Sequence, residues 1–211
     1  TATGTATRDM APKAEPLTDE QILMIVDLAN TSEVDQARIA HGKAKNARVK
    51  KFAQTMINHH MDAKQKGAKL TKKLGVTPAE STLWSQLASD SSNMMSTLKN
   101  TANADFDRTY IEQQIEAHTK VPATIDNQLV PNAKNTDLRA LLTEIRPKVE
   151  AHLAEAKDIQ QALANSTATS TSTGAKTGGT TGSASGTSGT GTSKSGTGAG
   201  TGSGTGTGTG T

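Results

Sequence analysis

Apolar side chains recur at steps of three and four residues over long stretches of this chain, and this spacing limits the possible folds most. Alternating steps of three and four place side chains on one stripe of an α-helix, which has about 3.6 residues per turn. The clearest stripe consists of Leu138, Leu142, Ile145, Val149, Ala156, Ile159 and Leu163. Such stripes predict an all-α protein whose helices bury their apolar faces against one another.

Composition limits how much of the chain can contribute to a core. From residue 165 onward the sequence is almost only Thr, Gly, Ser and Ala, with no apolar side chain larger than alanine. Residues 1–16 have a similar composition and contain two prolines. We therefore expect a disordered segment over residues 1–16, one helical domain over residues 17–164, and a low-complexity Gly/Ser/Thr tail over residues 165–211.

Capping residues mark where several of the expected helices begin and end. Thr18 is followed three residues later by Gln21, which together form a capping box for the first helix. The second helix is expected over residues 47–74, because Gly75 follows it and glycine readily adopts the left-handed conformation that ends helices. The remaining helices are expected over residues 77–100, 105–130 and 136–164.

The helix expected over residues 77–100 differs from the others. Thr77 and Pro78 begin it, and Glu80 completes a capping box. Its apolar stripe is thin and is interrupted at Asp90 and the two serines that follow. We therefore expect an antiparallel four-helix bundle with this segment as an additional crossover or peripheral helix.

Each helix of the expected bundle carries one ligand-type residue near its midpoint, within an otherwise apolar stripe. These residues are Glu33, His60, His118 and His152. Reversing the direction of a helix does not move its midpoint along the bundle axis, so we expect all of these residues at one level of the bundle. A buried carboxylate or imidazole is costly unless it is hydrogen-bonded, paired or bound to a metal. The pattern therefore predicts a metal site inside the bundle.

The chemistry of these residues narrows the choice of metal. Imidazoles with one carboxylate suit a single transition-metal ion such as zinc, copper, iron or manganese, whereas calcium and magnesium prefer oxygen ligands. A dinuclear iron centre of the ferritin-like type needs two Glu-x-x-His motifs, and the chain has none. The alternative is a metal-free hydrogen-bond network in a structural or interaction module of the cell envelope. His41 and His59 lie about 80–100° around their helices from Glu33 and His60, so we interpret both as surface residues.

Several function classes are disfavoured by composition and by missing motifs. The net charge is +3, but two positive charges lie in the tail at Lys176 and Lys194, so nucleic-acid binding is not expected. The sequence has no apolar stretch of about 18 residues that would predict a transmembrane helix. It also lacks a Gly-x-Ser-x-Gly elbow, a phosphate-binding Gly-rich loop and a His-Glu-x-x-His motif, so we assign no catalytic residues.

Four segments resemble successive helices of a bacterial family, domain of unknown function 4142. The segments are SEVDQARIA, VKKFAQTMINHH, FDRTYIEQQIEAHTKV and LRALLTEIRPKVEAHL. The resemblance covers about residues 17–164 and places Glu33, His60, His118 and His152 on the family's motifs. Members of the family resemble ferritin-like bundles, are generally predicted to be exported to the periplasm or outer membrane, and have no established activity. The resemblance therefore implies a ferritin-like fold and an extracytoplasmic location.

Other features agree with a location outside the cytoplasm without requiring it. The chain has no cysteine, and it begins at Thr1 without an apolar leader, as a secreted protein does after its signal peptide is removed. The tail is expected to be a flexible coil that tethers or spaces the domain, with envelope or self-association partners. Its hydroxyl groups suggest O-glycosylation, which would raise the intact mass above the 21.9 kDa of the bare chain.

Overall fold

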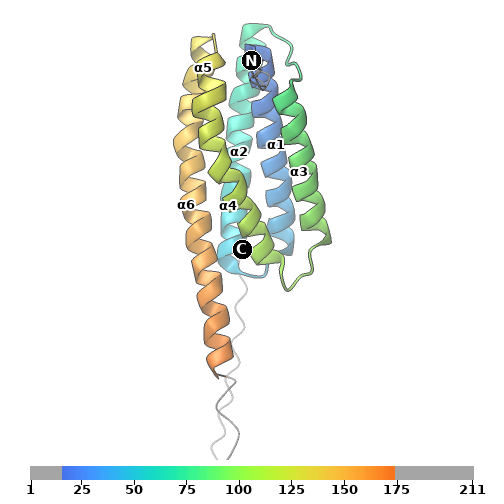
Figure 1. Ribbon diagram of the computed structural model, residues 1–211, viewed down its shortest axis with the longest axis vertical. Coiled ribbons are helices and arrows are strands. Elements are labelled where there is room, and N and C mark those ends of the chain that lie inside the picture. Colours follow the sequence, from blue (N-terminus) through green and yellow to red (C-terminus); the bar gives the residue numbers. More distant parts are fainter. Residues whose placement is uncertain (1–15, 174–211) are drawn as a thin grey trace, which may run out of the picture. The chain divides into compact units, whose positions relative to one another are not determined.

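The computed structural model describes residues 16–173, and in the last helix it describes side chains as far as residue 166. Helices make up all the regular secondary structure of these residues, which confirms the all-α prediction (Figure 1). The elements are α1 (Asp19–Lys43), α2 (Ala47–Leu74), α3 (Thr82–Asn100), α4 (Phe106–Thr124), the π-helical turn η1 (Ile125–Leu129), α5 (Val130–Asn132) and α6 (Thr136–Thr173).

The ends of α1 and α2 follow the predicted capping signals. The hydroxyl of Thr18 accepts a hydrogen bond from the Gln21 amide at 3.3 Å, and the Gln21 side chain accepts one from the Thr18 amide at 3.1 Å. This capping box satisfies two amides at the start of α1. Gly75 ends α2 with a φ of 66°, a left-handed conformation that costs glycine little.

The predicted start of α3 is wrong. The helix begins at Thr82 rather than near Thr77, and the Ser81 hydroxyl caps it by accepting from the Trp84 amide at 3.1 Å. The segment before it instead bonds to the first turn of α1. The Ala79 amide donates to the Glu20 carbonyl at 3.2 Å, and the Gln21 side chain donates to the Glu80 carbonyl at 3.2 Å. These tertiary bonds hold the backbone outside a helix, so the local capping signal does not prevail.

The helical segment that contains α4 also extends further than predicted. It was expected to stop before Pro131, but the chain passes through η1 and α5 and remains helical to Asn132. Proline lacks an amide hydrogen, and its ring crowds the carbonyl four residues earlier in an α-helix. The π-helical turn of η1 lies directly before α5 and widens the helix there, which explains how Pro131 is accommodated.

The last helix begins where predicted and ends later. Asn135 caps α6 by accepting from the amides of Asp137 at 2.9 Å and Leu138 at 3.1 Å. The helix was expected to end near Ala164 but continues to Thr173. Neither Gly nor Pro occurs between Pro147 and the residue that follows the helix, and extending an existing helix avoids the cost of nucleating a new one. The rest of the predicted tail and its predicted glycosylation lie outside the described residues, as does nearly all of residues 1–16.

Helices α1 and α2 run in opposite directions, as do α4 and α6 (Figure 1). The most extensive contacts are between α1 and α2 and between α4 and α6, and α2 also packs against α6. Helix α3 lies against α1, and Leu98 is its one buried residue. No helix of the described part of the chain is long and apolar enough to cross a membrane.

Two clusters of buried apolar residues fill the interior. The Phe52 cluster includes Ala37, Phe52, Met56, Phe106, Ile111, Ala156 and Ile159, and the Leu138 cluster includes Ile22, Val26, Leu70, Ile125, Leu138 and Leu142. Along α2, α4 and α6, the residues of the two clusters are separated by a segment that contains a buried histidine. The bundle therefore has a polar level between two apolar ones.

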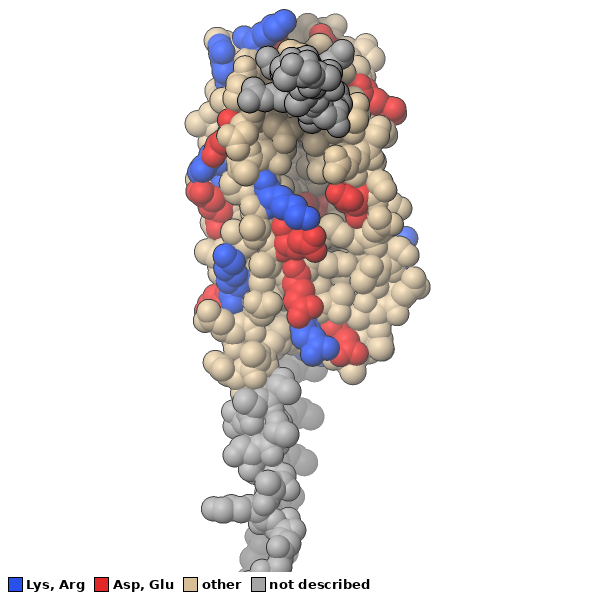
Figure 2. Space-filling view, viewed as in Figure 1, with Lys and Arg blue, Asp and Glu red and all other residues tan. Residues whose placement is uncertain are grey.

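The surface carries charges of both signs. On the face drawn in Figure 2, acidic and basic side chains lie close together rather than in separate areas. Some of these pairs join helices, for example Lys66 of α2, whose Nζ lies 2.6 Å from Oε1 of Glu144 in α6. Exposed ion pairs contribute about 0–1 kcal/mol each, so burial of the two apolar clusters contributes more to the fold.

Candidate metal centre

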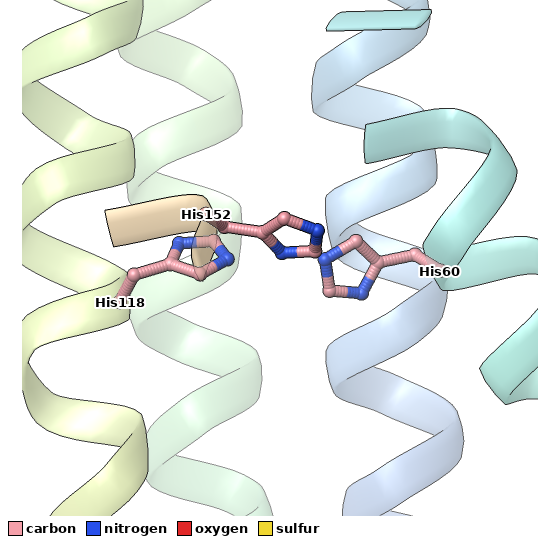
Figure 3. A group of neighbouring side chains, drawn as sticks. All are labelled: His60, His118 and His152. Atoms are coloured by element: carbon pink, nitrogen blue, oxygen red, sulfur yellow. The ribbon is translucent and has the colours of Figure 1, made fainter. Parts of the chain in front are cut away.

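Three histidines from three helices meet at the polar level of the bundle. His60 of α2, His118 of α4 and His152 of α6 each offer one ring nitrogen, and these atoms lie within 4.8 Å of one another. Figure 3 shows the three rings turned toward one another. Their residues are 8%, 2% and 3% exposed, respectively, so the group lies inside the protein.

The three rings are nearly equidistant. The ring centroids of His60 and His118 are 6.0 Å apart, those of His60 and His152 are 5.3 Å apart, and those of His118 and His152 are 5.4 Å apart. A zinc–nitrogen bond of about 2.0–2.1 Å in tetrahedral geometry separates ligand nitrogens by roughly 3.3 Å. Small side-chain movements would therefore bring the three nitrogens to bonding positions around one ion.

Asn30 fixes which nitrogen of His60 carries the proton. The Asn30 amide group donates to the Val26 carbonyl at 2.7 Å, so its Oδ1 is left to accept. That oxygen lies 2.9 Å from Nδ1 of His60, and Nδ1 must therefore be the donor. Nε2 of a neutral His60 then has no proton, and it is buried without a hydrogen-bond partner in the described residues.

A backbone carbonyl fixes His118 in the same way. Nδ1 of His118 lies 3.0 Å from the Gln114 carbonyl oxygen, which can only accept a hydrogen bond. Nδ1 is therefore the donor, and Nε2 of the neutral ring is free to bind a metal. Histidine ligands in metal sites are usually oriented by such a bond from the other ring nitrogen.

His152 has a different kind of partner. Its Nε2 lies 2.9 Å from Nδ1 of His59, and the two rings stack with centroids 5.2 Å apart. Its Nδ1 is buried and has no partner among residues 16–166. The nitrogens available to an ion are therefore Nε2 of His60, Nε2 of His118 and Nδ1 of His152.

Burial and the repulsion of like charges keep His60 and His152 neutral. Burial, followed by the like charges that His118, His152 and His59 would carry, lowers the pKa of His60 well below 6.5. Burial, then His118, His59 and Lys148, lowers the pKa of His152 to about 3. Neutral imidazole is the form that binds metal ions, so these two rings do not have to lose a proton at neutral pH.

The fourth predicted ligand, Glu33, does not belong to the group of converging atoms. It is half-buried on α1, one turn beyond Asn30, and its Oε2 is buried without a hydrogen-bond partner in the described part of the chain. Burial of Tyr110 is the main cause that raises its pKa well above 10.0, and the negative charge of Glu33 is the second cause. The structure therefore brings the three predicted histidines together and leaves Glu33 in an adjoining position.

Two residues that orient the histidines were not predicted to be part of the site. Asn30 lies on the apolar stripe of α1, three residues from Glu33, and this position could have identified it as buried. His59 is exposed, as interpreted from the sequence, yet it contacts His152. No sequence pattern predicts that contact, because it depends on the packing of α6 against α2.

Other buried polar groups lie on α1 and α4 next to this level. Gln36, Tyr110 and Gln114 are at most 1% exposed, and each has a side-chain oxygen or nitrogen without a hydrogen-bond partner in residues 16–166. A buried polar group without a partner costs roughly 1–3 kcal/mol. The bundle interior therefore carries a stability cost in this region.

Tyr110→Phe is expected to leave the apoprotein as stable as the wild type or to stabilise it by about 1 kcal/mol, because the buried hydroxyl has no partner. Urea unfolding in the presence of a chelator measures this difference. A loss of stability of about 1 kcal/mol or more would show that the hydroxyl has a hydrogen-bond partner in solution, and that expectation would then be wrong. Gln36→Leu tests the same argument on α1.

Fold and site together define a class: an all-α helical-bundle protein with a buried histidine cluster across three of its helices. The chain belongs to the family described as a domain of unknown function (DUF4142), whose model matches residues 3–159. This match confirms the resemblance found in the sequence. Comparisons with curated proteins and with solved structures gave no match.

Proposed function

We propose that the protein binds one transition-metal ion through His60, His118 and His152. The observation that carries this proposal is the hydrogen bonding of two of the rings: Asn30 and the Gln114 carbonyl accept hydrogen bonds from Nδ1 of His60 and Nδ1 of His118, respectively. The unprotonated nitrogens then lie close together inside the bundle. Such convergence is unfavourable without a bound cation or water, and it is the arrangement that a three-histidine metal site requires.

The ligand set favours zinc, copper, iron or manganese. Three neutral imidazoles bind these ions well, and no cysteine is present to supply a thiolate. Three protein ligands leave at least one position for water or another ligand. We assign no reaction to that position.

Glu33 supplies the negative charge that a buried cation needs. It is the one acidic residue in the described part of the chain with a buried, unpartnered carboxylate oxygen. A divalent ion held by neutral imidazoles keeps its full charge, so a carboxylate about one helical turn away stabilises the bound state. The predicted role of Glu33 as a direct ligand requires its side chain to rotate toward the histidines when metal binds.

Glu33→Gln is expected to lower zinc affinity about 10–100-fold, as loss of a group that supports a metal site does elsewhere. The amide keeps the size of the side chain and removes the buried charge, so the apoprotein should be no less stable. Competition with a zinc chelator measures the affinity. Asp35→Gln changes an exposed acid on the same helix and is the matched control. Equal affinities in both variants and wild type would contradict this role of Glu33.

Metal analysis of the purified protein tests the main proposal. The protein is prepared without a nickel column, and its metal content is measured together with that of a His60→Ala/His152→Ala double variant. About one equivalent of metal in the wild type and none in the double variant is the expected result. His41→Ala, which removes an exposed histidine outside the group, should keep the metal.

The second candidate function is a metal-free structural or interaction module. The hydrogen bonds from His60 to Asn30, from His118 to the Gln114 carbonyl and between His152 and His59 favour it, because all form without an ion. A protein that contains no metal, and whose melting temperature is unchanged by chelator or by added zinc, would establish this alternative.

We further propose a ferritin-like arrangement and an extracytoplasmic location. The first is supported by two antiparallel helix pairs, α1 with α2 and α4 with α6, and by the location of the histidines inside the bundle. The second is supported by the absence of cysteine. Cell fractionation tests the location, and recovery of the protein only in the cytoplasm would overturn it.

A further inference from the structure

The three rings of the candidate metal centre are not held equally. His60 and His118 donate to oxygen atoms of buried residues, which cannot act as donors in these bonds. His152 instead bonds to another imidazole, His59, and either ring of such a pair can be the donor. Hydrogen bonds within the bundle therefore determine which nitrogen carries the proton in His60 and in His118, but not in His152.

We propose that His59 is a positioning residue that makes Nδ1 of His152 the third metal ligand. This inference rests on the proposed metal site. Nδ1 of His59 accepts a hydrogen bond from Nε2 of His152, which leaves Nδ1 of His152 unprotonated inside the bundle. The 2.9 Å separation and the stacked rings hold the two imidazoles in this relation.

The opposite tautomer would prevent metal binding. If Nε2 of His152 accepted from His59, Nδ1 of His152 would carry a proton, and this proton would occupy the position of the ion. That proton would also be buried, with no acceptor within hydrogen-bond distance among the described residues. A positioning residue that favours the bare Nδ1 thus raises metal affinity without contacting the metal.

His59 is suited to this role by its position at the protein surface. It is exposed, whereas the rings of the trio are buried, so its Nε2 can donate to water while its Nδ1 accepts from His152. Because it makes only a small contribution to the core, replacing it should leave the fold intact.

Two substitutions separate hydrogen bonding from packing. His59→Ala removes the acceptor, and His59→Asn puts an amide oxygen near the former Nδ1. We expect His59→Ala to lower zinc affinity about 10–100-fold, and His59→Asn to recover most of that loss. Zinc affinity is measured by chelator competition on the full chain. The melting temperature of each apoprotein serves as the control for folding.

Nitrogen-15 chemical shifts of the imidazoles provide a readout that does not depend on bound metal. In the wild-type apoprotein, His152 should show a protonated Nε2 and a bare Nδ1, whereas His59→Ala should give averaged shifts of both tautomers. In His60 and His118 the proton should stay on Nδ1 in both proteins, because Asn30 and the Gln114 carbonyl remain.

The outcomes distinguish this inference from the proposed function. If the wild type binds zinc and His59→Ala binds it equally well, the role of His59 is wrong and the metal site stands. If His59→Ala and His59→Asn weaken binding equally, His59 acts by packing. If the wild type binds two equivalents of zinc and the His59 variants bind one, His59 is itself a ligand. Either result contradicts the inference. If the wild type binds no zinc but the tautomer of His152 depends on His59, the proposed function fails alone.

Discussion

Adding zinc to the metal-free protein is expected to raise its melting temperature by about 10 °C. An ion that binds only the folded state stabilises it by about 4 kcal/mol at a free concentration about 1,000 times Kd. For a domain of roughly 150 residues, each kcal/mol corresponds to about 2–4 °C. His118→Gln should abolish the shift, because it removes one of the three converging nitrogens. Thermal unfolding followed by circular dichroism, with and without zinc, measures both proteins.

The control is His41→Gln, which changes an exposed histidine on α1 and should keep the full zinc response. His152→Gln removes a second ligand from another helix, so the test does not depend on the folding of one variant. An equal zinc response in wild type, His118→Gln and His152→Gln would mean that zinc binds elsewhere, and the histidine site would then be rejected.

The apoprotein is expected to lose stability as the pH falls below about 6.5. His60 and His152 have lowered pKa values in the folded state, so below 6.5 the unfolded state binds more protons than the folded state does. Keeping these rings unprotonated therefore has no effect on the free energy of unfolding above that pH, and it lowers this free energy below that pH. For His152 this loss continues until the pH approaches its folded pKa of about 3. Each histidine contributes at most about 1.4 kcal/mol per pH unit.

Together, the two histidines should reduce the free energy of unfolding by about 3 kcal/mol between pH 6.5 and pH 5. Urea unfolding in chelator at several pH values measures this slope. A His60→Gln/His152→Gln double variant provides the comparison, because its carboxylates titrate as in the wild type while these two imidazoles are absent. Parallel pH profiles of the two proteins would show that the imidazoles are not buried in their neutral form.

The sequence predicted the helical architecture because apolar spacing alone determines which face of each helix is buried. Leu138, Leu142 and Ile159 of α6 lie in the core, as the stripe in the sequence indicated. The positions of His60 and His152 at helix midpoints predicted that they lie at one level, and they are neighbours in the structure. A midpoint position predicted the same level for Glu33, and this residue lies outside the group of converging atoms, because the height along a helix does not fix the direction of a long side chain.

The errors came from interactions that no local pattern contains. The first turn of α1 binds Ala79 and Glu80 and delays the start of α3, although Thr77 and Pro78 are good initiating residues. The contact between His59 and His152 likewise joins residues far apart in the chain. The start of α3 and the partner of His152 therefore depend on tertiary contacts, whereas the helices themselves follow from apolar spacing.

The two apolar clusters on either side of the histidines restrict how an ion travels. Side chains such as Phe52 and Leu138, both 0% exposed, block the bundle axis in both directions, and a hydrated cation crosses such hydrocarbon poorly. An ion would therefore have to pass sideways between helices, and His59, which is exposed and contacts His152, lies on one such side. The rate of metal exchange would then be set by movements of surface side chains such as this ring rather than by motion along the bundle.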